Sequence, residues 1–191
     1  MALATVHIRK EAFLILAWSA IETFKKECFG FIFGRSPTEK NNFFHITDVV
    51  PFQCARYRKN IGFELNERAG KKFEKFIATI GSAYPKYLGD FHSHPEWGGN
   101  TRSAEMSKLD LSRFSKTPEP LEFIIEISSR KKGRAPWEVF SDGSIGGSFG
   151  KFNLNFKIYT LVPNAEGEIL PSQLQIVAPR AIKTLNRINL K

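Results

Sequence analysis

The chain has 191 residues and a mass of 21.7 kDa, which is enough for one well-packed domain and excludes a second independent core. Hydrophobic residues make up 42% and charged residues 25%, so neither a disordered nor a collagen-like chain fits. The 28 Lys and Arg against 19 Asp and Glu give a net charge of +9, which suggests nucleic acid, anionic lipid or an acidic protein as partners.

Apolar spacing predicts alternating helices and strands along most of the chain. In chain order we expect a strand at 5–9, a buried helix at 11–26, strands at 27–34 and 42–51, an amphipathic helix at 67–80, a strand at 87–94, a short helix at 107–114, and strands at 121–128, 137–140 and 151–162. Clear periodicity is lost from Pro163 onward. We therefore predict one α+β domain over residues 1–162, with a mixed central β-sheet flanked by helices, and a C-terminal extension over 163–191 whose order stays open.

The basic residues are scattered, and their two densest runs are residues 56–59 and 130–134. Neither a recognition helix nor an aromatic stacking pattern accompanies these runs, so nucleic-acid binding is the weaker interpretation. The two cysteines, Cys28 and Cys54, cannot form a disulfide framework, which favours a reducing cytoplasm. The longest apolar run near the N-terminus is too short to cross a bilayer and lacks a cleavage site. We therefore expect a soluble cytoplasmic protein with no removed leader and no membrane partner.

The sharpest motif is Gly-Asp-Phe-His-Ser-His-Pro at residues 89–95. Alternate side chains of a strand share one face, so His92 and His94 project the same way and can bind one metal ion. A catalytic zinc ion typically keeps three protein ligands and one position for water, so a third ligand is required. Surface histidines at a strand end are the alternative, but two of only four histidines placed before a Gly-rich loop favour ligands. His7 and His45 each stand alone in an apolar strand and receive no role.

These residues resemble the motifs of the JAMM (MPN-plus, or Mov34/JAB) zinc metalloproteases, which combine an early Glu, a His-Ser-His-Pro sequence and a later Ser-x-x-Asp. Glu27 opens the stretch Glu-x-x-Gly-x-x-x-Gly at residues 27–34, and residues 46–51 are similar to the strand after it. The resemblance extends over residues 5–162. It implies the single-domain, cytidine-deaminase-like MPN fold and a stand-alone prokaryotic, archaeal-like member of the family.

The resemblance also implies the roles of these residues. His92 and His94 would bind Zn²⁺, and Glu27 would hold the catalytic water. Zinc lowers the pKa of its water toward 7 and polarises the scissile carbonyl, while the glutamate takes a proton and returns it to the leaving amine. The implied substrate is a ubiquitin-like modifier protein, or its conjugates, whose extended tail binds as an added strand. A basic surface could help to dock an acidic modifier.

The third ligand departs from the common spacing of the family, because an arginine occupies the usual serine position. Taking the next residue, Ser103, would put Met106 in place of the aspartate, and Met is a poor ligand beside nitrogen and oxygen donors. A longer loop makes Ser107 and Asp110 the Ser-x-x-Asp pair. Asp110 is then the expected third ligand, and Ser107 the hydroxyl that stabilises the oxyanion. Glu105 stays open as the alternative ligand and Ser103 as the alternative serine.

The predicted function is a zinc metallopeptidase, a deubiquitinase-like isopeptidase. The loop at residues 96–106 contains Trp97 and two glycines, and either a substrate lid or a tolerated insertion fits it. Cys28 follows Glu27 but has no nucleophile pattern around it, so we interpret it as a small apolar residue. The main alternative function is a catalytically inactive MPN-type scaffold for protein assembly, which applies if Asp110 does not reach the histidines. The modifier and the oligomeric state stay open.

Overall fold

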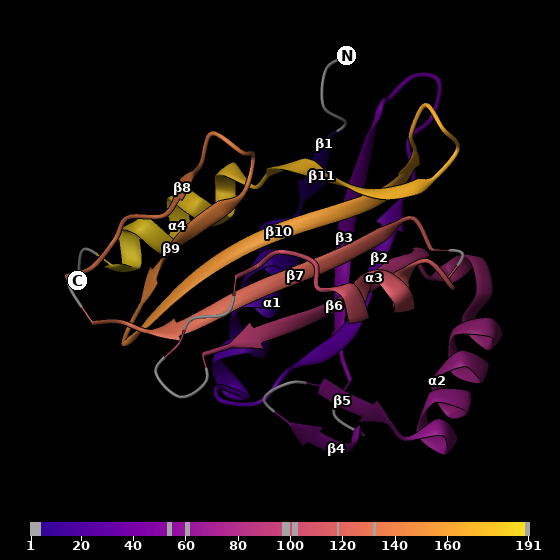
Figure 1. Cartoon of the computed structure of the whole chain (residues 1–191), viewed down its shortest axis with the longest axis horizontal. Helices are drawn as coiled ribbons and strands as arrows, with labels where there is room; N and C mark the ends of the chain where they lie inside the picture. Colours follow the sequence, from indigo (N-terminus) through magenta and orange to yellow (C-terminus); the bar gives the residue numbers. More distant parts are fainter. Residues whose placement is uncertain are drawn as a thin grey trace.

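The computed structural model of the chain describes residues 5–52, 55–59, 62–96, 100, 103–117, 119–131 and 133–189. Its main feature is a nine-stranded sheet in the order β11-β1-β3-β2-β6-β7-β10-β9-β8. Because β10 also pairs with β11, seven strands close into a barrel, and β9 and β8 extend from β10 (Figure 1). The strands are β1 Thr5–Ile8, β2 Phe29–Arg35, β3 Phe43–Pro51, β6 Lys86–Pro95, β7 Leu121–Ser129, β8 Glu138–Val139, β9 Ile145–Phe149, β10 Phe152–Pro163 and β11 Ile169–Val177.

The expected α+β fold of MPN type, a mixed central sheet flanked by helices, is wrong. The sheet closes on itself, and the described part of the chain is mostly β. The α-helices in this part are short: α1 Lys10–Glu22, α2 Glu67–Ile80, α3 Lys108–Phe114 and α4 Pro179–Asn189. The closing strand is β11, which pairs parallel with β1 and antiparallel with β10. It comes from the segment after Pro163, where the sequence had indicated no strand.

The other expected strands and helices are present, with small shifts at their ends. The sequence does not indicate β9, because its second and third residues are Gly146 and Gly147, and glycine weakens the strand signal. Tight packing explains both glycines. A Cβ atom on Gly146 would lie 2.5 Å from the ring of Phe140, and one on Gly147 would lie 2.6 Å from the indole of Trp137. This part of the sheet is therefore shaped by close approach to aromatic rings rather than by strand propensity.

Strands β6 and β7 bury different clusters on their two faces. Phe91 of β6 and both Phe123 and Ile125 of β7 are fully buried in the main core, together with the apolar side of α1. Ile124 points the other way and packs with Phe114 of α3. Helix α1 therefore lies behind these strands and α3 in front of them (Figure 1). Neighbouring residues of a strand point to opposite faces, so the residues of β6 directly before and after Phe91 face α3. The candidate site lies on this side of the sheet, called the α3 face below.

Helix α2 stands at the side of the barrel (Figure 1). Its N-terminus is capped by Asn66, whose Oδ1 accepts a hydrogen bond from the backbone N–H of Ala69 at 3.2 Å. None of its residues is buried, and its Phe73 ring stacks on Phe31 of β2 with ring centroids 4.6 Å apart. A separate antiparallel hairpin of β4 Ala55–Lys59 and β5 Gly62–Leu65 precedes it. Among the described residues, no helix combines the length and the apolar character needed to cross a membrane.

Candidate metal centre

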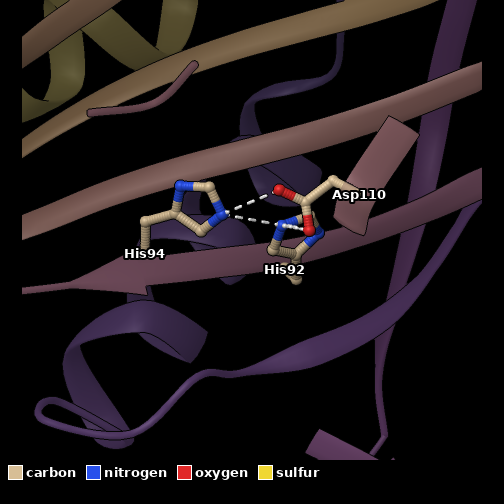
Figure 2. Close-up of side chains that lie close together, drawn as sticks. All are labelled: His92, His94 and Asp110. Carbon is tan, nitrogen blue, oxygen red and sulfur yellow. Dashed lines mark hydrogen bonds and ion pairs between the residues drawn. The ribbon is translucent and has the colours of Figure 1, made fainter. Parts of the chain in front are cut away.

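Three predicted ligands converge on one point of the α3 face. His92 and His94 come from the carboxyl-terminal half of β6, and Asp110 comes from the first turn of α3. All three are buried, with 5%, 2% and 8% of their surfaces exposed. Their side chains point toward one another (Figure 2), and one ligand atom from each lies within 4.8 Å of the other two. The group could therefore hold a metal ion.

The separations between the ligand atoms are those of a small cation site. The Nε2 atoms of His92 and His94 are 3.0 Å apart. Oδ1 of Asp110 lies 3.4 Å from Nε2 of His92, and Oδ2 lies 3.3 Å from Nε2 of His94. Ligands about 2.0–2.2 Å from a tetrahedral zinc ion are about 3.3–3.6 Å from one another. The three residues therefore match zinc geometry after a slight widening between the two imidazoles, and they leave a fourth position for water or substrate.

Hydrogen bonds at the far side of each ring orient the two imidazoles. Nδ1 of His92 lies 2.7 Å from Oε1 of Glu122, and Nδ1 of His94 lies 2.7 Å from the carbonyl oxygen of Ser103. Because a carbonyl and a carboxylate accept hydrogen bonds, both Nδ1 atoms are the donors. In a neutral imidazole the Nε2 lone pair is then free to bind a cation. Both lone pairs point at the same place as the carboxylate of Asp110.

The electrostatics of the group favour a positive charge at its centre. Burial disfavours the charged form of His92, but hydrogen bonds with Asp110 and Glu122 outweigh burial and raise its pKa to about 10. Burial also acts to raise the pKa of Asp110, yet hydrogen bonds with His92 and His94 hold that pKa well below its usual range. The site thus keeps a carboxylate ionised in a buried place and stabilises a proton beside it. A metal cation can replace that proton.

Asp110 is positioned by a capping box at the start of α3. The Ser107 hydroxyl accepts a hydrogen bond from the backbone N–H of Asp110 at 3.2 Å, and Oδ2 of Asp110 accepts one from the backbone N–H of Ser107 at 2.9 Å. The same carboxylate therefore caps the helix and faces the histidines. The hydroxyl predicted to stabilise an oxyanion lies next to the third ligand, and its own hydrogen remains available as a donor.

The alternative ligand, Glu105, is held elsewhere. Its Oε1 lies 2.5 Å from Nζ of Lys157, and its Oε2 accepts a hydrogen bond from the Tyr159 hydroxyl at 2.9 Å. Lys157 also lies 3.0 Å from Oδ2 of Asp142. These contacts fasten the segment before α3 to β10. Glu105 is therefore outside the group of ligands, and the structure places Asp110 there instead.

The predicted proton acceptor, Glu27, lies two residues before the start of β2 and is 4% exposed. The backbone N–H of Cys28 donates to Oγ of Ser93 at 2.8 Å, and the backbone N–H of Ser93 donates to the carbonyl of Cys28 at 3.2 Å. Because β2 and β6 run antiparallel, the residue before Cys28 lies level with the residue after Ser93. Glu27 is therefore brought to the level of His94, at the same end of β6.

Two acidic residues beside the histidines were not predicted from the sequence. Glu122 lies on β7 and accepts the hydrogen bond from His92. Asp90 lies on β6, opposite Glu122, and accepts a hydrogen bond from the Tyr87 hydroxyl. Burial, reinforced by the negative charge of Glu122, raises the pKa of Asp90 to about 7. One sequence pattern could have indicated Glu122. Acidic residues occupy alternate positions of the otherwise apolar strand β7, where Glu122 and Glu126 lie on either side of Ile124 on the face of the metal centre.

Several predicted features lie only partly within the described residues. Of the loop at 96–106, which contains the hypothetical lid, residues 97–99 and 101–102 lie outside the described residues, Trp97 among them. Cys54 and the side chains of residues 56–59 also lie outside. Cys28 is buried in the main core, where it packs as a small apolar residue. Ser103, the alternative serine, contributes its backbone carbonyl to the site while its hydroxyl accepts a hydrogen bond from Glu105 N–H at 3.1 Å.

Comparison with models of known protein families gives no match, and no curated protein matches the chain in sequence. Support for a function therefore comes from the geometry of the metal centre and from the motifs that build it.

Proposed function

We propose that the protein is a zinc-dependent hydrolase that cleaves peptide or isopeptide bonds. The observation that carries the proposal is the buried group of His92, His94 and Asp110, whose ligand atoms surround one point at separations of 3.0–3.4 Å. Two nitrogens and one oxygen form the ligand set of hydrolytic zinc sites with one open position. Zinc bound there would act as a Lewis acid and lower the pKa of water toward 7.

The residues around the group support hydrolysis rather than a purely structural metal. Glu27 is a buried carboxylate at the level of His94, where it would take a proton from the attacking water and give it to the leaving amine. The Ser107 hydroxyl would donate a hydrogen bond to the carbonyl oxygen of the substrate as negative charge develops on it. A structural zinc site needs neither group, because its four positions are filled by protein ligands.

The bond type is supported by the resemblance of these motifs to those of JAMM metalloproteases, which suggests the tail of a ubiquitin-like modifier as substrate. An apolar groove on the same side of β2 and β6 supports an extended polypeptide. Phe31 of β2 pairs with Asp90, two residues before His92, so the groove begins about 7 Å along the strand from the metal centre. Its cavity of about 360 Å³ is lined by Phe31, Phe33, Phe52, Phe73, Ile77 and Tyr87. An apolar side chain of the tail would fit there.

Metal analysis and one charge-neutral variant test the hydrolase. Protein purified without added zinc should retain about one zinc ion per chain. Glu27→Gln should keep that zinc while losing most of its cleavage of ubiquitin-like proteins extended at the C-terminus or joined to a lysine. Glu22→Gln, the same change at an exposed position just upstream, is the control and should cleave normally. Zinc without any cleavage would favour the scaffold function, and absence of zinc would contradict both the metal and the chemistry.

The groove is tested separately by two phenylalanines of α2. Phe73 lines the groove and stacks on Phe31, whereas Phe76 is 57% exposed and does not line the groove. Phe73→Ala should raise KM several-fold with little change in kcat, because it removes a contact with the substrate tail and leaves the metal ligands in place. Phe76→Ala should leave both constants unchanged. A loss confined to kcat, or an equal effect of the two changes, would contradict a role of the groove in substrate binding.

A further inference from the structure

A second cavity lies where two neighbouring parallel strands end. Strand β1 pairs parallel with β11, and each strand leads directly into a helix, β1 into α1 and β11 into α4. The cavity has a volume of about 480 Å³ and lies between these strand ends and helix starts. Crevices at the carboxyl ends of parallel strands, beside helix N-termini, commonly bind ligands. None of the residues of the metal centre lines this cavity.

The lining of the cavity is basic. His7 of β1 and His45 of β3 are direct partners in the sheet, so their half-buried side chains project from the same face. Arg9, Lys10 and Arg180 complete the basic wall. No sequence pattern predicts a role for either histidine, because they are 38 positions apart and only the pairing of β1 with β3 brings them together. The arrangement therefore concentrates hydrogen-bond donors, and those of Arg9, Lys10 and Arg180 carry a positive charge.

The acidic residue in the lining does not cancel the positive charge of the cavity. Glu11 is the acidic residue among those that line the cavity, and its carboxylate lies 3.2 Å from Nζ of Lys10. Burial, together with the nearby charges of Arg35 and Arg9, lowers the pKa of His45, as expected in a positive environment. At neutral pH such a ring still donates one N–H to a ligand.

The start of α1 adds further donors. Arg9 occupies the N-cap position and its side chain makes no capping hydrogen bond, while the carboxylate of Glu11 accepts a hydrogen bond from its own backbone N–H. Helix α4 begins at Pro179, with Arg180 as its second residue. Backbone N–H groups at a helix start favour anions, and here they support a cavity that is already basic.

We propose that this cavity binds a phosphate group, through the imidazoles of His7 and His45 and the guanidinium groups of Arg9 and Arg180. Arginine matches tetrahedral oxyanions with paired N–H donors, and neighbouring imidazoles supply single donors. The cavity is larger than one phosphate, which leaves room for the organic part of a small phosphate ester. This site is independent of the zinc-dependent function, since it shares no residue with it.

The four histidines of the chain allow a direct test on the whole protein by NMR. Inorganic phosphate and glycerol phosphate are titrated separately, with sodium chloride at matched ionic strength as the control. The ring resonances of His7 and His45 should shift and saturate with phosphate but not with chloride. Those of His92 and His94 should not follow the same curve. Tighter binding of glycerol phosphate would identify an ester as the ligand, and equal binding would identify free phosphate.

Two matched variants of α4 separate a site from general charge attraction. Arg180→Gln removes a cation from the cavity, and Arg187→Gln makes the same change at an exposed position at the other end of the helix. Arg180→Gln should weaken phosphate binding about tenfold, whereas Arg187→Gln should leave it unchanged. Shifts that never saturate, or an equal loss in the two variants, would overturn the proposal whether or not the protein binds zinc.

Discussion

Nδ1 of His92 donates a hydrogen bond to Oε1 of Glu122 over 2.7 Å, from one strand of the barrel to the next. This contact fixes the tautomer of a predicted zinc ligand, and loss of such a partner typically weakens metal binding by about 10–100-fold. We expect Glu122→Ala to lower zinc affinity within that range, as measured by competition with a chromophoric chelator. Glu122→Gln keeps an acceptor oxygen and should lose less. Equal affinity of Glu122→Ala and the wild type would show that the hydrogen bond does not tune the site.

The third ligand can be tested with two isosteric variants. Asp110→Asn replaces a charged ligand within 3.3–3.4 Å of both imidazoles by a weak neutral one, so the protein should lose nearly all of its zinc. Glu105→Gln makes the same change at the residue that pairs with Lys157, and zinc content should stay at one ion per chain. The zinc content of both variants, measured after dialysis, shows which of the two carboxylates binds the metal. Retention of zinc by Asp110→Asn would exclude Asp110 as a ligand.

Local sequence patterns predicted the parts of the site that depend on local geometry. The strand alternation that brings His92 and His94 to one face requires only a spacing of two residues. The Ser-x-x-Asp pattern that places Ser107 and Asp110 in one capping box lies within a single helical turn. Glu122 could not be predicted in the same way, because only the parallel pairing of β6 with β7 puts it beside a histidine 30 residues earlier.

Closure of the barrel escaped prediction for a related reason. Strand β11 buries only Leu174 and Ile176 fully and contains Pro171, which normally argues against a strand. Its stability comes from two partners that are distant in sequence, β1 and β10, rather than from its own apolar pattern. Without β11, the strands predicted from the sequence would form an open mixed sheet. Pairing of β11 with both β1 and β10 closes that sheet into a barrel.

Ser107 has one observed role, as a helix cap, and one proposed role, as an oxyanion donor, and measurement can separate the two. Its hydroxyl caps α3 at Asp110 N–H, and removal of such a cap costs about 1 kcal/mol of stability. Ser107→Ala should therefore lower the free energy of unfolding by about 1 kcal/mol, keep its zinc, and lower kcat through loss of the oxyanion donor. Ser107→Thr retains the hydroxyl and should recover most of both losses. A normal kcat in Ser107→Ala, together with a reduced kcat in Ser103→Ala, would assign the oxyanion role to Ser103.

Zinc affinity should rise steeply with pH, because His92 must lose its proton before its Nε2 can bind the metal. In the metal-free protein the pKa of His92 is raised from 6.5 to about 10 by Asp110 and Glu122, despite burial. Zinc that binds there would therefore displace a proton throughout the neutral range. The apparent affinity should increase about tenfold per pH unit between about pH 6 and 8, measured by chelator competition in non-coordinating buffers.

The stability of the metal-free protein gives an independent check, because it should fall as the pH rises, whereas the zinc affinity should increase. A histidine whose pKa is raised on folding stabilises the folded state fully below its unfolded value of 6.5, and this contribution disappears as the pH rises through about 10. Urea unfolding in the presence of a chelator should show this decline, and His92→Gln should remove it. In Glu122→Gln the pKa of His92 should fall, so both the decline in stability and the rise in zinc affinity should move to lower pH. A zinc affinity independent of pH would mean that no proton shares the site with the metal.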